Sequence, residues 1–185
     1  GDTWLHQESA ITETDDLINY NDMSNMLDIT SIWTPDKIFL MNQTNEIPSS
    51  EYFDPHPSGA FAILNTQKLM NFIRSGCSVV LNDVTHLNPK IKSVASFLEE
   101  KTGAQVQANI YFSMGNNKAF GPHFDTHDVF AIHCQGSKDW NVYKKREEHP
   151  INSPEFKLSK EEKKRRAGEL EKVVTLNPGD FLYLP

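Results

Sequence analysis

The sequence has few cysteines, no long apolar run and no excess of basic charge. Its 185 residues include two cysteines, Cys77 and Cys134, which lie far apart in the chain. Without a Cys-x-x-Cys spacing, neither a disulfide framework nor a structural zinc site is indicated. No segment approaches the roughly 20 apolar residues that a membrane-spanning helix requires. We therefore expect a globular protein of the reducing cytoplasm that has no membrane partner.

The charge of the chain limits its partners. It carries 18 Lys and Arg residues against 25 Asp and Glu residues, which gives a net charge of −7. An acidic chain is not attracted to a phosphate backbone, so we expect no direct nucleic-acid partner. The run of basic residues at 163–166 is interleaved with acids and predicts a solvated helix or a mobile insert. A basic protein partner is compatible with this balance.

The first 104 residues predict helices packed on short strands. Apolar residues recur at helical spacing in three segments, and two short apolar runs lie between turn signals. Asn88 and Pro89 mark the start of the third helix, and Gly103 marks its end. The prolines between residues 45 and 58 predict an irregular loop. The expected elements are helices at 12–27, 66–76 and 88–103, and strands at 38–41 and 77–81.

From residue 105 onward the pattern predicts β structure. Apolar and polar residues alternate over 105–112, with Asn109 and Tyr111 on the polar face. This face either lines a ligand cavity in a small barrel or is solvated. Further strands are expected at 129–134 and 140–143, joined as a hairpin by the turn at 135–137. A helix capped by Ser159 extends through Lys172, and strands at 172–176 and 181–184 flank the turn at 177–180.

The stretch GPHFDTHDVF at 121–130 contains a candidate metal-binding pair. If it is extended, His123 and Asp125 project to the same face, because side chains two positions apart share a face. Two histidines and one carboxylate on one face leave positions open on non-haem Fe(II). A His-x-Asp pair is also compatible with an ordinary polar surface loop. The second histidine would have to come from elsewhere.

Several motifs in order resemble the cupin-type JmjC oxygenases. They are NIYFS at 109–113, GPHFD at 121–125, DVF at 128–130, GSKDW at 136–140 and PGDFLYLP at 178–185. The branch that they resemble is the ribosomal oxygenases, which hydroxylate a residue of a ribosomal protein. The resemblance implies a mainly β fold with flanking helices, a double-stranded β-helix of the cupin or jelly-roll type. Residues 1–185 would form a single domain, with an N-terminal flank at 1–104 and an incomplete β-helix core at 105–185, truncated at its C-terminal end.

The resemblance also implies a site. His123 and Asp125 match the family's first two Fe(II) ligands, and Lys138 matches the basic residue that pairs with the distal carboxylate of 2-oxoglutarate. Asn109 matches a polar residue that lines the co-substrate pocket, and Tyr111 shares its face. In the family, the second histidine follows an Arg-Gly pair shortly after the segment that resembles LYLP, so we expect the third ligand just beyond Pro185. His127 is an in-chain substitute, and His133 is a weaker one.

The implied activity is hydroxylation of a protein side chain by an Fe(II)- and 2-oxoglutarate-dependent dioxygenase. The resemblance favours a ribosomal protein as substrate and allows a homodimer formed through downstream regions. Two alternatives remain. One is a JmjC demethylase or another cupin oxygenase, which would share the metal chemistry. The other is a non-catalytic cupin that serves as a binding or dimerisation module.

Overall fold

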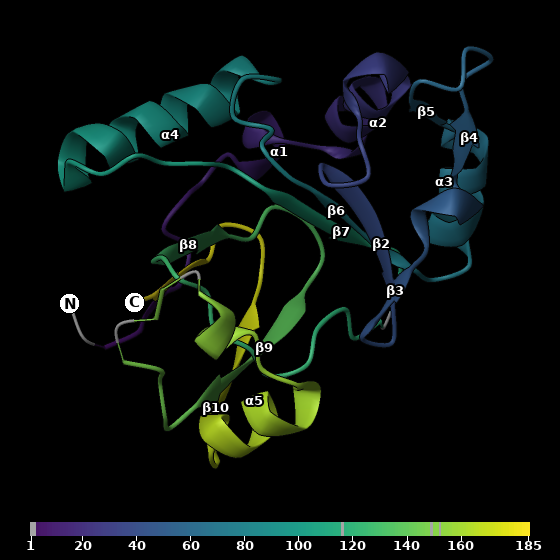
Figure 1. Cartoon of the computed structure of the whole chain (residues 1–185). Coiled ribbons are helices and arrows are strands. Elements are labelled where there is room, and N and C mark those ends of the chain that lie inside the picture. Colours follow the sequence, from purple (N-terminus) through teal and green to yellow (C-terminus); the bar gives the residue numbers. More distant parts are fainter. Residues whose placement is uncertain (1–2, 116, 149, 152) are drawn as a thin grey trace. The chain divides into compact units, whose positions relative to one another are not determined.

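The computed structural model describes residues 3–115, 117–148, 150–151 and 153–185 (Figure 1). The chain divides into two compact units. Unit 1 consists of Gly1–Asn19 and Gly121–Pro185, and unit 2 consists of Tyr20–Phe120. This division differs from the expected boundary near residue 104, so the single-domain organisation stays a prediction. Among the described residues, no helix combines the length and apolar character needed to cross a membrane.

Unit 2 is built on a four-stranded antiparallel sheet. Its order is β3 (Asn45–Ile47), β2 (Ile38–Asn42), β6 (Ser78–Leu81) and β7 (Ile110–Ser113). All four residues of β6 are buried, as expected for a central strand that is covered on both faces. A separate two-stranded sheet pairs β4 (Phe53–Pro55) with β5 (Ala62–Leu64). Short 3₁₀ helices lie at Thr30–Ile32 and Ser49–Glu51.

The helices of unit 2 follow the local signals closely. They are α2 (Tyr20–Asp28), α3 (Thr66–Arg74) and α4 (Pro89–Thr102). The Asn88 side chain caps α4 by accepting hydrogen bonds from the backbone N–H groups of Lys90 and Ile91. Gly103 ends it in the left-handed conformation. The Asn65 side chain caps α3 by accepting a hydrogen bond from the backbone N–H of Lys68.

Unit 1 contains two small antiparallel sheets. One has the order β1 (Leu5–Gln7), β11 (Phe181–Leu184), β8 (Val129–Ile132), and the other pairs β9 (Lys138–Tyr143) with β10 (Leu170–Leu176). The two sheets share one apolar cluster, which contains Val142, Val174, Leu176 and Leu182. Unit 1 also has the helices α1 (Thr14–Leu17) and α5 (Lys160–Ala167) and a 3₁₀ turn at Pro154–Phe156. The expected class, mainly β strands with flanking helices, is confirmed, and the complete β-helix stays a prediction.

The predicted hairpin between residues 129 and 143 is wrong. β8 pairs with β11 and β9 pairs with β10, so the chain passes from one sheet to the other at residues 133–137. Local alternation shows which residues of a strand are buried but not which strand lies beside it. Along the chain, β8 lies in one sheet, β9 and β10 pair in the other, and β11 returns to the first.

Other boundaries also differ from expectation. The helix predicted at 12–27 is interrupted at Ile18, whose backbone is extended, and the helix that Ser159 caps ends at Ala167 before Gly168, which has φ 73°. The loop predicted at 45–58 contains two strands and a 3₁₀ turn. The hairpin into β3 was missed because Gln43 and Thr44 both adopt positive φ without a glycine. The strand predicted at 105–112 begins only at Ile110.

Candidate functional site

His123 and Asp125 lie in unit 1, immediately before β8. The structure places both side chains on the surface, in a stretch without regular secondary structure. The Nδ1 atom of His123 lies 2.9 Å from the carbonyl oxygen of Gly121. Because a carbonyl only accepts, Nδ1 carries the hydrogen in this bond, and Nε2 then has the lone pair. A backbone carbonyl bonded to the other ring nitrogen is a common feature of metal-binding histidines.

The residues that follow this pair contact the C-terminal end of β11. The hydroxyl of Tyr183 donates to Oδ2 of Asp128 at 2.8 Å, and Val129 pairs with Leu184. The end of β11 therefore lies beside the residues that follow Asp125. No role was assigned to Asp128 from the sequence, although it belongs to one of the quoted motifs.

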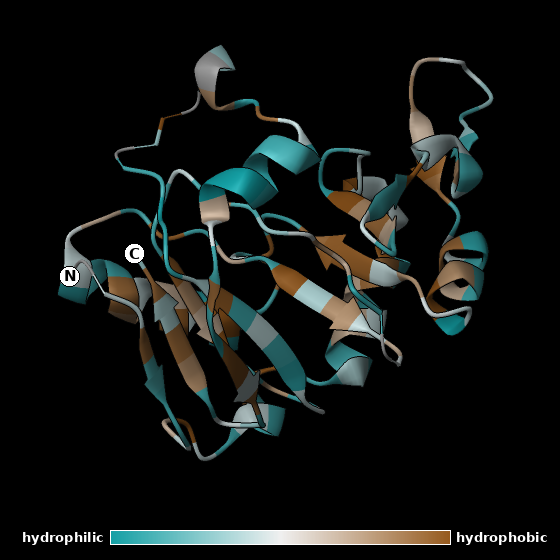
Figure 2. Cartoon of the chain, turned by 90° about the horizontal axis from the view of Figure 1, so that it is seen from below, coloured by the Kyte–Doolittle hydropathy of each residue, from teal (hydrophilic) through white to brown (hydrophobic). Residues whose placement is uncertain are grey.

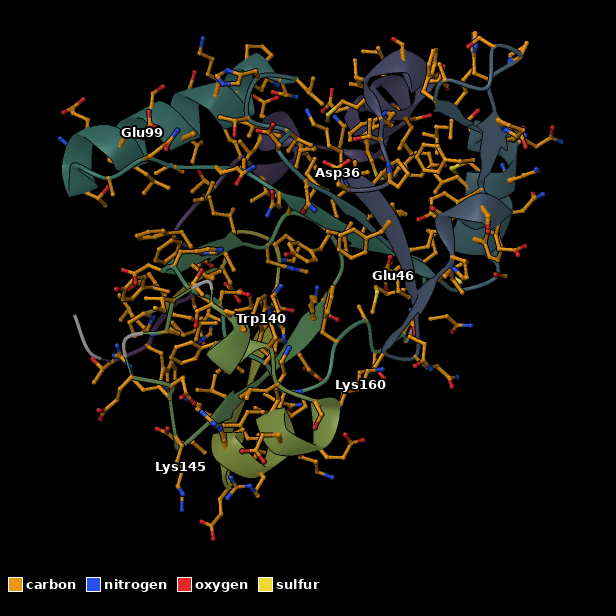
Figure 3. The ribbon with its side chains drawn as sticks, viewed as in Figure 1. Asp36, Glu46, Glu99, Trp140, Lys145 and Lys160 are labelled. Atoms are coloured by element: carbon orange, nitrogen blue, oxygen red, sulfur yellow. The ribbon has the colours of Figure 1, made fainter. Side chains whose placement is uncertain are left out.

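Lys138 is the first residue of β9 and is paired with Leu176 on β10. Its Nζ atom lies 5.7 Å from the centroid of the Trp140 ring, which is labelled in Figure 3. Residues two apart on a strand share a face, and Trp140 packs against the apolar cluster of unit 1. Burial lowers the pKa of Lys138, because the charged form loses solvation. The structure thus places this lysine in a partly dry interior, where a carboxylate would stabilise its charge.

Asp180 is the most buried ionisable side chain near these residues, at 3% exposure. Its Oδ1 accepts from the Ser9 N–H at 2.9 Å and its Oδ2 from the Asn177 N–H at 2.8 Å, while His6 Nε2 lies 3.5 Å from Oδ2. The backbone N–H groups of Asn177 and Ser9, and then His6, lower the pKa of Asp180. This carboxylate joins the N-terminal segment to the turn between β10 and β11. The Asn-Pro-Gly-Asp turn was predicted, but the distant N-terminal partners carry no local signal.

The neighbouring Gly179 explains how the N-terminal segment lies so close to this turn. Its φ is +94°, and a Cβ at this position would lie 2.4 Å from the carbonyl oxygen of Ile11. The Ile11 N–H donates to the Gly179 carbonyl at 3.0 Å. Only glycine allows this close approach of two backbone segments.

Asn109 and Tyr111 belong to unit 2. The Oδ1 atom of Asn109 accepts a hydrogen bond from the backbone N–H of Asp83 at 3.0 Å. This bond stabilises Asp83, whose φ of 58° lies in the left-handed region. Tyr111 is 52% exposed and meets Phe120 edge-on, with ring centroids 5.9 Å apart. The structure therefore gives Asn109 a local role in a loop. Its assignment to a co-substrate pocket, together with that of Tyr111, stays a prediction.

The in-chain substitutes for the third ligand lie on either side of β8. His127 is exposed, and its Nδ1 lies 3.1 Å from the Asp128 carbonyl oxygen. His133 is half-buried just after β8. Within the described parts of the chain, no three His, Cys, Asp or Glu side chains are grouped as a metal site would require. Neither histidine therefore completes a site with His123 and Asp125 in this structure.

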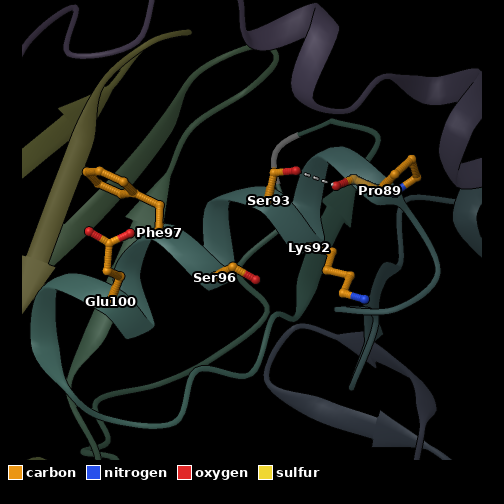
Figure 4. Close-up of a pocket in the computed structure, with 6 residues that line it drawn as sticks. All are labelled: Pro89, Lys92, Ser93, Ser96, Phe97 and Glu100. Carbon is orange, nitrogen blue, oxygen red and sulfur yellow. Dashed lines mark hydrogen bonds between the residues drawn. The ribbon is translucent and has the colours of Figure 1, made fainter.

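A surface hollow along α4 carries none of the candidate residues. It is lined by side chains of one helix face, where Ser93 donates to the Pro89 carbonyl at 2.9 Å and Phe97 is 57% exposed (Figure 4). The lining offers no paired ligands for a metal. The charged helix α5 is mostly hydrophilic in Figure 2 and forms ion pairs, such as those of Arg166 with Glu162 and Glu147.

Known proteins similar to this chain agree with the motifs. Residues 81–185 match the family model described as JmjC domain. Ribosomal oxygenase 1 of Danio rerio is 34% identical over 119 residues, which cover 62% of this chain and 21% of the relative. A protein of Dictyostelium discoideum named bifunctional lysine-specific demethylase and histidyl-hydroxylase NO66 is 35% identical over 112 residues, which cover 60% of this chain and 21% of the relative.

The similarity in structure is broader. The ribosomal oxygenase YcfD of Escherichia coli, solved in complex with cobalt and 2-oxoglutarate, superposes with a TM-score of 0.61 at 17% identity. The superposition covers 99% of this chain and 42% of YcfD. At this identity the likeness shows the fold. The chain spans about a fifth of the length of its curated relatives and about two fifths of YcfD.

Proposed function

Because the chain belongs to the JmjC domain family, we propose that the protein is an Fe(II)- and 2-oxoglutarate-dependent dioxygenase that hydroxylates a side chain of a ribosomal protein. The observation that carries this proposal is the extent of the family match. Residues 81–185 include all five candidate site residues, namely Asn109, Tyr111, His123, Asp125 and Lys138. The names of the relatives and the ligands of the YcfD complex support the same reaction class.

The donor atoms of the first pair fit the metal. His123 would bind through Nε2, because its Nδ1 hydrogen is donated to the Gly121 carbonyl. The Asp125 carboxylate would supply a hard oxygen ligand, and an imidazole–carboxylate set of this kind suits Fe(II). Exposure of both groups leaves room for a third ligand and for the reactants.

The third ligand is proposed to follow Pro185. β11 runs antiparallel to β8, with Leu184 opposite Val129. A continuation in this register would pass Asp128 and then reach the level of Asp125 and His123. A histidine there would approach the pair from an adjacent strand, whereas His127 would crowd three ligands onto one segment.

Lys138 would hold the distal carboxylate of 2-oxoglutarate. Its ammonium group is held over Trp140 in a partly dry interior, so a carboxylate would restore the stabilisation that burial removes. The assignment of Asn109 and Tyr111 to co-substrate binding is part of the same proposal. When bound, the metal and the keto acid supply the oxidising chemistry, and the protein contributes orientation and exclusion of water.

The substrate is proposed to be a basic protein. The net charge of −7 favours approach of a basic partner, and the similarity to ribosomal oxygenases points to a ribosomal protein. A cytoplasmic location, the absence of direct nucleic-acid binding and a homodimer formed through downstream regions remain predictions.

Lysine demethylation is the second candidate. The observation that favours it is the name of the NO66 relatives, which assigns both demethylase and histidyl-hydroxylase activity to those proteins. Both reactions would use the same ligands and the same lysine, so only the substrate separates them.

The test uses the full-length protein with Fe(II), 2-oxoglutarate and O₂. We would incubate it with purified ribosomal proteins and, separately, with methyl-lysine histone peptides, and analyse both by mass spectrometry. One added oxygen on a ribosomal protein supports hydroxylation, and loss of a methyl group supports demethylation. Activity should disappear in His123→Ala and persist in His127→Ala. If neither substrate changes and no succinate forms, the chain is a non-catalytic module and the proposal is wrong.

A further inference from the structure

Two nitrogen-bearing side chains project into the same interior of unit 1. On β8, residues two apart share a face, so Val129, Ala131 and His133 form one row. Ala131 packs against the apolar cluster, which shows that this row faces inward. The His133 N–H donates to the Asp180 carbonyl at 3.0 Å, and the His133 carbonyl accepts from Gly179 at 2.9 Å, so His133 continues the strand pairing.

Lys138 belongs to the inward row of the opposite sheet. Trp140 and Val142, two and four residues further along β9, both take part in the apolar cluster. Only the four residues at 134–137 separate His133 from Lys138. Both side chains therefore extend the inner faces of their sheets at the end where the chain crosses between them.

The imidazole of His133 has an unused polar atom. Its Nε2 is buried and, among the residues that the structure describes, makes no hydrogen bond. A buried donor or acceptor without a partner costs about 1–3 kcal/mol, so such atoms in native proteins usually have a purpose. The other buried group nearby that could accept a hydrogen bond, Asp180, already accepts from Ser9 and Asn177 and has His6 beside it.

The charged forms of both side chains lose solvation at this position. Burial is the main cause that lowers the pKa of His133, and the Lys138 charge lowers it further. Hydrogen bonds to the backbone of Gly136 and Gln135 and the charge of Asp180 act in the opposite direction. Burial lowers the pKa of Lys138 as well. Two cation-forming groups in one partly dry interior favour an anion between them.

We propose that His133, protonated beside the bound anion, donates its Nε2–H to the distal carboxylate of the 2-oxo acid, beside Lys138, and so makes the site selective for a dicarboxylate. This inference rests on the proposed function and adds a binding residue to it. His133 then has a role in co-substrate recognition in place of the weaker metal-ligand role considered from the sequence.

The test compares two keto acids of equal chain length. 2-Oxoglutarate has the distal carboxylate, and 2-oxopentanoate has a methyl group in its place. Calorimetric titration would measure the affinity of both for the full-length protein loaded with Co(II) in the absence of oxygen. His133→Phe keeps a ring of similar shape without Nε2–H, His133→Gln keeps an N–H near that position, and His127→Phe is the matched control.

We expect His133→Phe to lose about tenfold in affinity for 2-oxoglutarate, the loss of one charge-assisted hydrogen bond, with no change for 2-oxopentanoate. His133→Gln should recover most of this loss, and His127→Phe should match the wild type. The inference is overturned if His133→Phe binds 2-oxoglutarate as the wild type does, or loses affinity for both keto acids equally.

Failure of the inference and failure of the proposed function can be told apart. If the wild type binds 2-oxoglutarate and only Lys138→Met weakens it, the function stands and the role of His133 is wrong. If the wild type binds neither keto acid, both are wrong. Should His133→Phe not fold, ¹⁵N NMR of the wild-type imidazoles replaces it: the His133 Nε2 resonance should shift with 2-oxoglutarate and not with 2-oxopentanoate, and an unchanged resonance refutes the role.

Discussion

The two units of the chain differ in what they bury. Of the buried apolar side chains that the structure describes, only Val142, Val174, Leu176 and Leu182 belong to unit 1, and all the others belong to unit 2. Unit 1 buries the carboxylate of Asp180 and partly buries Lys138 and His133, whereas the buried polar residues of unit 2, namely Ser78, Thr85 and Asn88, are uncharged. An apolar interior supports a rigid scaffold, whereas polar groups held in a dry interior are costly and typical of binding sites. The comparison assigns the proposed chemistry mainly to unit 1.

The largest stability effects should come from fully buried leucines in the core of each unit. Leu182 on the central strand β11 and Leu69 on α3 are both 0% exposed. Leu→Ala at either position should cost about 2–5 kcal/mol, measured by denaturant unfolding. Leu182→Ala should also weaken 2-oxoglutarate binding, because the cluster supports Trp140 beneath Lys138. Leu69→Ala should leave binding intact, and equal loss of binding in both variants would refute the division of roles.

The next effect concerns the charge of Lys138. Lys138→Met should weaken 2-oxoglutarate binding by roughly ten- to a hundredfold, since a charge-assisted pair contributes about 1.5–3 kcal/mol. In the wild type, burial lowers the pKa of Lys138. The affinity should therefore fall at a lower pH than the ordinary lysine value of 10.5 would predict, because deprotonation removes the cation. The check is to measure the affinities for 2-oxoglutarate and for 2-oxopentanoate over a range of pH and to take their ratio. A ratio that stays constant with pH would contradict the role of the Lys138 charge.

A smaller effect is expected for the carboxylate that joins the N-terminal segment to unit 1. Asp180→Asn should lower the melting temperature by several degrees at neutral pH, because the N–H groups of Asn177 and Ser9 lose a charged acceptor. The folded-state pKa of Asp180 lies below 3.8. Its stabilisation is therefore complete above the unfolded value of 3.8 and is lost as the pH falls through the folded value.

Melting curves from neutral to acid pH test this dependence. The difference between wild type and Asp180→Asn should shrink as the pH falls. Asp139→Asn, at an exposed carboxylate of the same unit that accepts from the Thr175 hydroxyl at 2.7 Å, serves as the control. A larger effect in the control would show that the burial of Asp180 is unimportant.

The smallest effect is expected on α5. Hydrogen bonds from Arg165 and Arg166 lower the pKa of Glu162 to about 2. The network is exposed to solvent and screened by salt, so Glu162→Gln should lower the melting temperature by less than about 2 °C, and less still at high salt. Glu161→Gln on the same helix turn is the control. A large loss would mean that this helix supports the fold more than its exposure indicates.

Local signals in the sequence predicted much of unit 2 and less of unit 1. Asn88 and Gly103 bound α4 as expected, and β2 and β6 follow their apolar runs, because caps and short buried strands are encoded by adjacent residues. The pairing of β1 with β11 joins segments at opposite ends of the chain, and no local pattern records it. The wrong hairpin at β8 and β9 has the same origin.

The candidate site was also predicted only in part. His123, Asp125 and Lys138 came from motifs, and the structure supports the partly dry environment of Lys138. The unpartnered Nε2 of His133 and the backbone donors around Asp180 could not be predicted, because they depend on how distant segments meet. Resemblance of motifs therefore indicated the residue types, while the packing identified the environment in which they act.

The central claim is that His123 and Asp125 bind the metal. Anaerobic titration of the full-length protein with Co(II), followed by visible absorption, tests it most directly, with His127→Ala as the control from the same exposed segment. The account predicts that His123→Ala and Asp125→Ala lose tight binding and that His127→Ala keeps it. Wild-type binding in His123→Ala, or an equal loss in His127→Ala, would contradict it.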